Sequence, residues 1–399
     1  MKQTCQISRW LIGFFICLST LLSACQAGVE APTTPSPEAT ARPTASPTTI
    51  SLPATPTPTI PVATPTLSLP GPPPPFLYIH ENKLFERTGS KNPRILADLP
   101  DAGEVLDARV VGDVVLVLRV QGLQRVRLTN GTTDLLLRFE VPAYSGALTA
   151  DGTQVIYQQV PSGMGAHITV YQVGTAKVRT VLSFAQIMDV LGMDMLGVNV
   201  LGLTADGSGL YLIPVGQDGS VGRLLVAALD SGEIEEIETE LPFEGVLASL
   251  APNGRFIVAP EPQDTLNLYD LTTEIPKGHR VKLPHAPSHI SIRGLVWVPD
   301  GHSVYFSILA GNCHDYDPDN PPAFYGLWCL DVESRALSQV AVAAEAESQF
   351  ISISPDGQWL LLRYIREAMW TDTATIVHLP SGASQSFTLP GEAVVVGWR

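Results

Sequence analysis

Along residues 76–399, short apolar runs alternate with polar turns at regular intervals. Five copies of a tetrapeptide ending in Asp-Gly or Asn-Gly each precede such a run, and a degenerate sixth copy, Val111-Gly112-Asp113, precedes another. The five copies occupy residues 149–152, 204–207, 251–254, 298–301 and 354–357. Asp-Gly and Asn-Gly supply the positive φ that a tight hairpin turn needs, and the apolar run after each turn predicts a strand.

The spacing of the turns indicates a repeated unit of four strands. Successive copies lie roughly 40–55 residues apart, and each interval holds further strand-like runs, such as 266–269 and 280–283. Four strands per period of this length are typical of a β-propeller blade. No Gly-His and Trp-Asp pair recurs, so the repeat is not the Trp-Asp type.

The two ends of this region predict how the ring closes. Residues 392–398 have the pattern of an innermost strand, whereas 76–80, 84–86 and 95–97 have that of the three outer strands of a blade. Pairing them gives a composite blade that leaves no free sheet edge. With six complete blades the expected count is seven, although six or eight also fit the pattern.

Two other segments have predicted positions in the ring. The acidic run 233–238 fits an outer strand whose charges deter edge pairing, with an acidic binding patch as the alternative. Residues 183–191 predict a short helix between blades, with Ser183 as its cap.

The form Ser354-Pro355-Asp356-Gly357, followed by an amide residue and an apolar strand, resembles the repeats of TolB-like propellers and of the propeller domains of prolyl oligopeptidase relatives. The resemblance covers about 75–399 and implies an all-β propeller. In prolyl oligopeptidase relatives the catalytic triad lies on a separate α/β-hydrolase domain, which we do not expect here. The one partial nucleophile motif, 301–305, lacks its second glycine.

The N-terminus has the three-part form of a secretory signal. Lys2 and Arg9 precede an apolar run over 10–22, which is shorter than the roughly 20 residues of a membrane-spanning helix. Leu22-Ser23-Ala24-Cys25 resembles the lipobox of bacterial lipoproteins, which implies removal of residues 1–24 and diacylation of Cys25. An ordinary cleaved signal with an incidental cysteine is the alternative.

Residues 25–75 are expected to join the lipid anchor to the domain. From 31 onward this segment is built almost entirely from Pro, Thr, Ser and Ala, which cannot offset the entropy of ordering. Repeated prolines favour an extended polyproline II spacer. We therefore expect a lipid-anchored, extracytoplasmic protein, on the cell surface or in the periplasm.

The net charge limits the classes of binding partner, and the cysteine content predicts how the thiols are used. The formal net charge is −15, with 39 acidic against 24 basic residues, which argues against nucleic-acid binding. We expect a monomer. Cys313 and Cys329 are the two cysteines of the region 76–399, and in an exported chain such a pair predicts a disulfide. Metal ligation by two thiolates is the alternative.

Three unusual segments are predicted to meet on one face of the ring. If the first strand of each blade runs down the channel, the Asp-Gly turns lie on the bottom face and the loops 285–289, 311–320 and 366–370 on the top face. The candidate binding residues there are His285, His289, His314, Asp315, Tyr316, Asp317, Asp319 and Trp370.

The residue types in these loops are compatible with two kinds of metal site, one for calcium and one for a transition metal. Asp315, Asp317 and Asp319 alternate like the start of a calcium loop, but Asn320 and Gly326 replace the glycine and glutamate of that pattern, so a solvated polar loop is the alternative. The three histidines could hold a transition metal. We expect no other cofactor.

We expect a non-enzymatic module that binds a protein, peptide or glycan partner. The alternative is a propeller enzyme, such as a polysaccharide lyase or hydrolase, that uses top-face His and Asp residues. Its discriminating feature is His285, His289 and a carboxylate from 315–319 within about 5 Å of one another, since catalytic groups must meet around one substrate.

Overall fold

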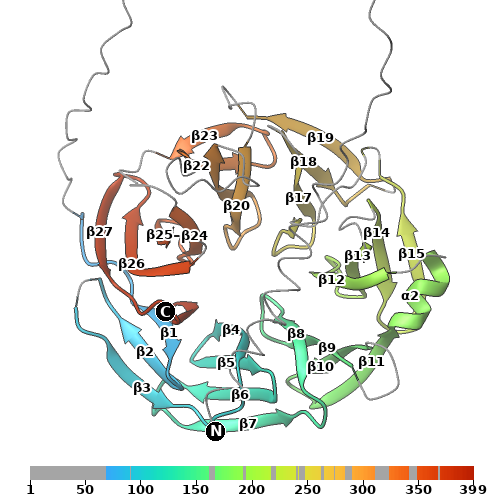
Figure 1. Cartoon of the computed structure of the whole chain (residues 1–399), viewed down its shortest axis with the longest axis horizontal. Coiled ribbons are helices and arrows are strands. Elements are labelled where there is room, and N and C mark those ends of the chain that lie inside the picture. The colour runs from blue at the N-terminus through green and yellow to red at the C-terminus, as the bar shows by residue number, and fades with distance from the viewer. Residues whose placement is uncertain are drawn as a thin grey trace, which may run out of the picture. The chain divides into compact units, whose positions relative to one another are not determined.

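The computed structural model describes residues 69–399 except 90, 161–166, 192–194, 217–221, 240, 242–247, 262–264, 274, 284–289, 311–322, 341–347 and 367–368. These residues belong to one compact unit, Leu67–Arg399. Within the described residues, seven antiparallel sheets of four strands stand around a central opening (Figure 1). The predicted seven-bladed β-propeller is confirmed.

Each sheet runs from an innermost strand to an outermost one. The innermost strands are β4 (Val105–Val111), β8 (Ala143–Leu148), β12 (Met195–Leu203), β16 (Ser249–Leu250), β20 (Ile290–Trp297), β24 (Ser348–Ile353) and β28 (Val394–Trp398). The second strands are β5 (Val114–Arg119), β9 (Gln154–Gln159), β13 (Gly209–Gly216), β17 (Phe256–Glu261), β21 (Ser303–Ala310), β25 (Trp359–Arg366) and β1 (Phe76–His80).

The two outer strands of each sheet follow in the same order. The third strands are β6 (Gly122–Arg127), β10 (His167–Gln172), β14 (Leu224–Ala228), β18 (Thr265–Asp270), β22 (Ala323–Asp331), β26 (Met369–His378) and β2 (Lys83–Arg87). The outermost are β7 (Thr133–Arg138), β11 (Lys177–Ser183), β15 (Ile234–Ile237), β19 (Lys277–Lys282), β23 (Leu337–Val340), β27 (Ala383–Thr388) and β3 (Arg94–Asp98).

The closing sheet joins the two ends of the region, as the sequence predicted. Its order is β28-β1-β2-β3, and Phe76 pairs with Trp398 in the antiparallel register of β1 and β28. The N–H of Arg399 then donates to the carbonyl of Pro75 at 2.8 Å. The ring therefore has no open sheet between its first and last strands.

The core lies between neighbouring sheets because the second strands bury both faces. In β5, Val115 and Val117 pack toward the closing sheet, whereas Leu116 and Leu118 pack toward the β8–β11 sheet. Alternate side chains of a strand point to opposite faces, so one apolar run supplies two layers of core. Seven apolar clusters of described residues fill the seven spaces between sheets in this way.

The predicted turns join the first strand of each sheet to the second. Gly152, Gly207, Gly254, Gly301 and Gly357 have φ between +67° and +75°, a conformation that favours glycine. The acidic run also lies where it was expected, because β15 is the outermost strand of its sheet.

The helix between blades is confirmed as α2 (Phe184–Leu191). The N–H of Gln186 donates to the Ser183 hydroxyl at 3.3 Å, and the Gln186 amide oxygen accepts the Ser183 N–H at 2.8 Å. This reciprocal pair is a capping box. In the described part of the chain, no helix is long and apolar enough to span a membrane.

The structure does not contain the disulfide that the sequence predicted for Cys329. Cys329 is a free thiol in the structure, and Cys313 lies outside the described residues. Cys329 pairs with Tyr305 within the sheet, six residues along β22 from the strand end that follows loop 311–322. Burial raises the pKa of the Cys329 thiol.

Candidate functional site

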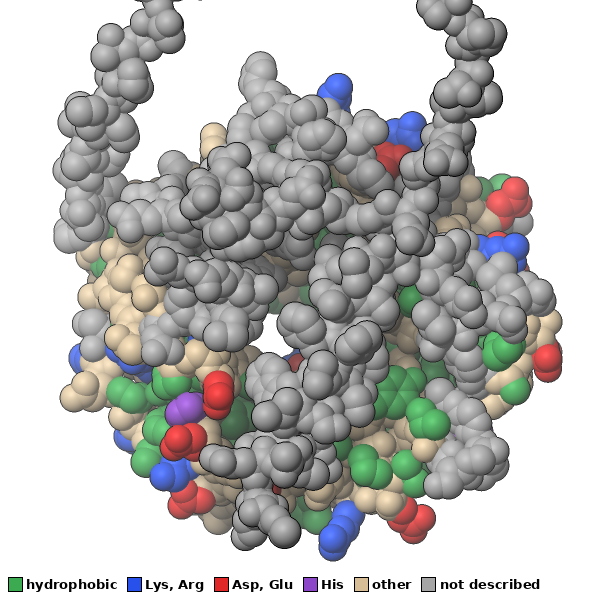
Figure 2. Space-filling model, viewed as in Figure 1, with side chains coloured by type: hydrophobic (Ala, Val, Ile, Leu, Met, Phe, Trp, Pro, Cys, Tyr) green, Lys and Arg blue, Asp and Glu red, His purple; other side chains and the backbone are tan. Residues whose placement is uncertain are grey.

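The candidate site is the cavity enclosed by the innermost strands. It has a volume of about 1080 Å³ and is lined by residues from all seven of them, namely β4, β8, β12, β16, β20, β24 and β28. It extends to the Asp-Gly turns at one end. Figure 2, seen along the same direction as Figure 1, shows the hollow at the centre of the ring.

The geometry of the inner strands gives the cavity wall its polar character. Each innermost strand pairs on one side only, so its other edge, with backbone N–H and C=O groups, faces the cavity. One of these edge groups has a side-chain partner from the neighbouring sheet: the Leu148 N–H donates to Asp107 Oδ2 at 2.7 Å. The remaining backbone N–H and C=O groups on these inner edges can bind water or a ligand.

Arg109 is the one cationic side chain among the described residues that line the cavity. Its Nε lies 3.7 Å from Asp107 Oδ2, and the guanidinium-bearing side chain is 43% exposed. The Asp107 carboxylate accepts two backbone N–H groups, that of Ala108 at Oδ1 and that of Leu148 at Oδ2, and Arg109 faces it as an ion pair without a hydrogen bond. Asp107 thus links β4 to β8 through the Leu148 N–H.

The turn carboxylates at the cavity mouth are occupied by their own turns. Asp206 Oδ1 accepts the Thr204 hydroxyl at 2.6 Å and the Ser208 N–H at 3.0 Å. These hydrogen bonds, that from Thr204 first, lower the pKa of Asp206 to about 2. Asp151 accepts the same bonds from Thr149 and Thr153. Such carboxylates serve the turn and have little capacity left for a cation.

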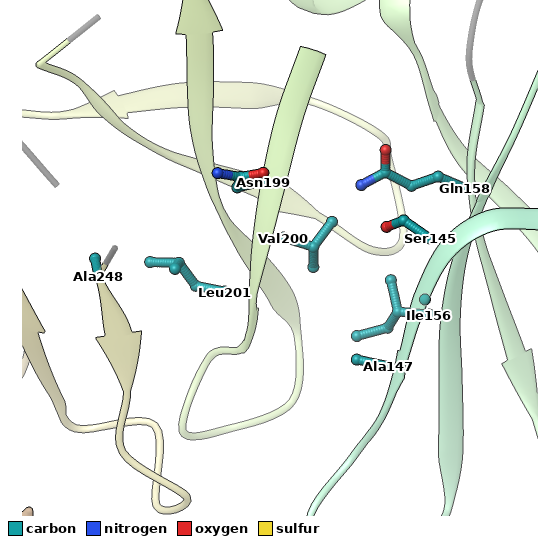
Figure 3. Close-up of a pocket in the computed structure, with 9 residues that line it drawn as sticks. Ser145, Ala147, Ile156, Gln158, Asn199, Val200, Leu201 and Ala248 are labelled. Atoms are coloured by element: carbon teal, nitrogen blue, oxygen red, sulfur yellow. The ribbon is translucent and has the colours of Figure 1, made fainter. Parts of the chain in front are cut away.

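A smaller crevice of about 240 Å³ opens from the cavity wall between the β8–β11 sheet and the β12–β15 sheet (Figure 3). Its polar side chains are Ser145, Gln158 and Asn199, and no charged residue lines it. Ala147, Ile156, Val200, Leu201 and Ala248 line both spaces, so the crevice and the cavity are continuous.

Most of the residues that the sequence singled out lie elsewhere. Outside the described residues are Cys25, His285, His289, His314, Asp315, Tyr316, Asp317 and Asp319. Trp370 lies in β26, where only its backbone is described. The predicted convergence of the three loops is therefore untested. Among the described residues, no group of three or more His, Cys, Asp or Glu side chains could hold a metal ion.

Sequence reasoning missed the residues of the cavity wall. Their position relative to the turns could have identified them, because each innermost strand ends directly before a turn. Ser145 and Asn199, for example, precede the turn glycines Gly152 and Gly207 by seven and eight residues. Counting back from each glycine would have identified the inner strands, although not which side chains face a crevice.

Comparison with known proteins supports the fold and nothing finer. No protein-family model matches the chain, and no curated protein sequence matches it. An oligogalacturonate lyase solved in complex with manganese is similar in structure, with a TM-score of 0.50 and 13% identity over 79% of this chain and 84% of that one.

Two further structures are similar at lower scores. An oligogalacturonate lyase from Vibrio parahaemolyticus has a TM-score of 0.49 and 12% identity over 78% of this chain and 83% of its own. TolB from Acinetobacter baumannii has a TM-score of 0.41 and 12% identity over 81% and 82%. At these identities the similarity concerns the β-propeller fold alone, because one fold carries many functions.

Proposed function

We propose that this protein is a lipid-anchored, extracytoplasmic β-propeller that acts as a binding module for a protein, peptide or glycan. The repeats would form a TolB-like propeller, an assignment that rests on the Ser354-Pro355-Asp356-Gly357 form of the turn. The chain acts by presenting a rigid ring to its partner, at a distance from the membrane that the proline-rich segment sets.

The observation that carries the binding role is the open cavity of about 1080 Å³. Ligand sites in proteins are concave, largely preformed and lined by apolar groups with a few directed polar ones. The cavity has this character, because its wall combines aliphatic side chains of the inner strands with amides, hydroxyls and the Asp107–Arg109 pair. A wall made by seven packed sheets is also preorganised, which lowers the entropy cost of binding.

Support for the anchor comes from the order of segments at the N-terminus. A charged start, an apolar run and Leu22-Ser23-Ala24-Cys25 precede a long segment of Pro, Thr, Ser and Ala. Two acyl chains on Cys25 would give stable membrane attachment, since each buried CH₂ contributes about 0.8 kcal/mol.

The anchor is tested by a Cys25→Ser variant of the full chain, expressed in a bacterium that processes lipoproteins. We expect the wild-type chain in the membrane fraction and the variant in the soluble extracytoplasmic or culture fraction. Cys329→Ser is the matched control and should fractionate like wild type, because Cys329 is a half-buried residue of β22 in the propeller. Unchanged membrane association of the Cys25→Ser chain contradicts lipid attachment.

The binding role is tested by capture of partners with the untethered Cys25→Ser chain from intact cells, after cross-linking. We expect one specific partner, and an Arg109→Ala variant should reduce its yield because Arg109 lines the cavity. An Arg335→Ala variant, altered at an exposed turn between β22 and β23, should capture as well as the parent. Turnover of a polysaccharide by the purified chain, without stable capture, would instead favour the enzyme alternative.

A further inference from the structure

The crevice between β8 and β12 has a polar lining that is uncharged. Ser145 lies on β8, Gln158 on β9 and Asn199 on β12. Figure 3 shows the Ser145 hydroxyl and the Gln158 amide directed across the crevice toward β12, which carries Asn199 and Val200. Groups that both donate and accept hydrogen bonds therefore face a common space.

The Gln158 amide is fixed in one orientation. It is 4% exposed, its Nε2 donates to the Val198 carbonyl of the next sheet at 3.0 Å, and its Oε1 accepts the Tyr144 hydroxyl. The bond to Val198 joins the two neighbouring sheets at the crevice, whereas the bond from Tyr144 lies within the β8–β11 sheet. Together the two bonds determine which end of the amide is a donor and which an acceptor, so this part of the lining is preorganised.

By contrast, Ser145 and Asn199 have unused hydrogen-bonding capacity. Among the described residues, neither the Ser145 hydroxyl nor the Asn199 amide has a hydrogen-bond partner. The Asn199 residue is exposed and Ser145 is half-buried. Both groups can therefore bind a ligand without first losing a protein contact.

Tyr144 does not line the crevice, and its hydroxyl donates to Gln158, which does. The register shift between Ala143 and Ser145 makes Tyr144 the extra residue of a β-bulge, a feature that redirects side chains and is frequent near binding sites. Tyr144 is 50% exposed, and burial of its hydroxyl end raises its pKa, so the phenol stays neutral at physiological pH.

We propose that this crevice binds a neutral saccharide unit. Sugar hydroxyls both donate and accept, as do the amides and the serine, and the aliphatic C–H face of a sugar ring suits Val200 and Ile156. An ionised ligand would lose its hydration without gaining a counter-charge, which is unfavourable. The inference deepens the proposed binding role by assigning its ligand class and rests on that role.

The test is isothermal titration of the full chain with three neutral disaccharides (maltose, cellobiose and N,N′-diacetylchitobiose) and with one blocked neutral tetrapeptide. We expect saturable binding of at least one disaccharide and none of the peptide. Asn199→Ala should weaken that binding about three- to tenfold, the effect of one lost hydrogen bond. Gln172→Ala, which alters an exposed amide at the end of β10, should leave it unchanged.

Asn199 is exposed, so its substitution should preserve the fold, which an unchanged melting temperature would verify. Ser145→Ala provides a second variant with the same expected loss. Three outcomes overturn the inference: no disaccharide binding, binding that both variants leave intact, or binding of the peptide alone. Specific partner capture together with any of these would leave the binding role standing and remove only the saccharide subsite.

Discussion

The aspartates of the repeated turns act as local acceptors. In the turn after β12, Asp206 accepts hydrogen bonds from Thr204 and Ser208, two residues to either side. The Thr204 N–H bonds the Gly209 carbonyl across the turn at 2.9 Å, and Gly207 takes the positive φ. These hydrogen bonds favour the charged form of the Asp206 carboxylate, and they lower its pKa to about 2.

The first prediction concerns how the stabilising contribution of Asp206 changes at acidic pH. Because the pKa of Asp206 is lowered from 3.8 to about 2, its contribution to stability is complete above about pH 4 and is lost as the pH falls toward 2. Asp206→Asn should lower the melting temperature at pH 7, and the difference from wild type should shrink between pH 4 and 2. Thermal melts monitored by circular dichroism measure this.

A control separates this effect from general acid unfolding. Asp98→Asn, at the exposed end of β3, should leave the difference near zero at every pH. A constant difference between wild type and Asp206→Asn across pH 7 to 2 would contradict the role of the charged carboxylate.

At the residue scale, the sequence predicted the turns because Asp-Gly encodes a local conformation. It did not predict that Arg119 and Arg363 would be buried, at 2% and 3% exposure, because charge alone gives no sign of burial. Nor did it predict that Cys329 would be a free thiol that pairs with Tyr305 between β21 and β22.

At the scale of elements, each sheet is specified by a strong second strand and weaker outer strands. The second strands β5, β9 and β17 are buried over most of their length, whereas outer strands such as β7 and β15 are mostly half-buried or exposed. A fully buried strand reads as a continuous apolar run, which made these strands the clearest in the sequence.

The innermost strands were harder to predict, and the candidate site lies on them. They pair with another strand on one edge only and carry bulges, as at Tyr144 in β8 and between Val200 and Gly202 in β12. A bulge shifts every later side chain by one position, so simple alternation fails there. The polar lining of the crevice could therefore not be derived from periodicity, although the position of the strand could.

At the scale of the whole molecule, contacts gather around the closing sheet. Three buried arginines bond carbonyls at or beside it: Arg87 Nη1 donates to Thr388 at 2.7 Å, Arg119 Nη1 to Gly103 at 2.8 Å, and Arg363 Nη1 to Ala393 at 2.9 Å. A guanidinium can satisfy several carbonyls at once in a connection that forms no regular ladder. The connections next to the closing sheet are thus held by one arginine of that sheet, Arg87, and by one arginine from each neighbouring sheet, Arg119 and Arg363.

The chain end is held in the same way. Burial alone would raise the pKa of Glu86 on β2, but hydrogen bonds from Arg399 and Arg94 and their charges lower it overall. Arg399 follows β28 directly, so this contact ties the last residue to the third strand of the closing sheet. The sequence predicted that the ends pair, from their apolar patterns, but not this carboxylate between two arginines.

The central claim is that β28 and β1 close a ring of seven sheets and so create the cavity in which a ligand binds. Hydrogen exchange of the intact chain, followed by mass spectrometry, tests it directly. The amides of Val394–Trp398 that pair with β1 should exchange on the minutes-to-hours timescale of global opening, together with those of Phe76–His80. Complete exchange of Val394–Trp398 within seconds, while β25 stays protected, would contradict ring closure.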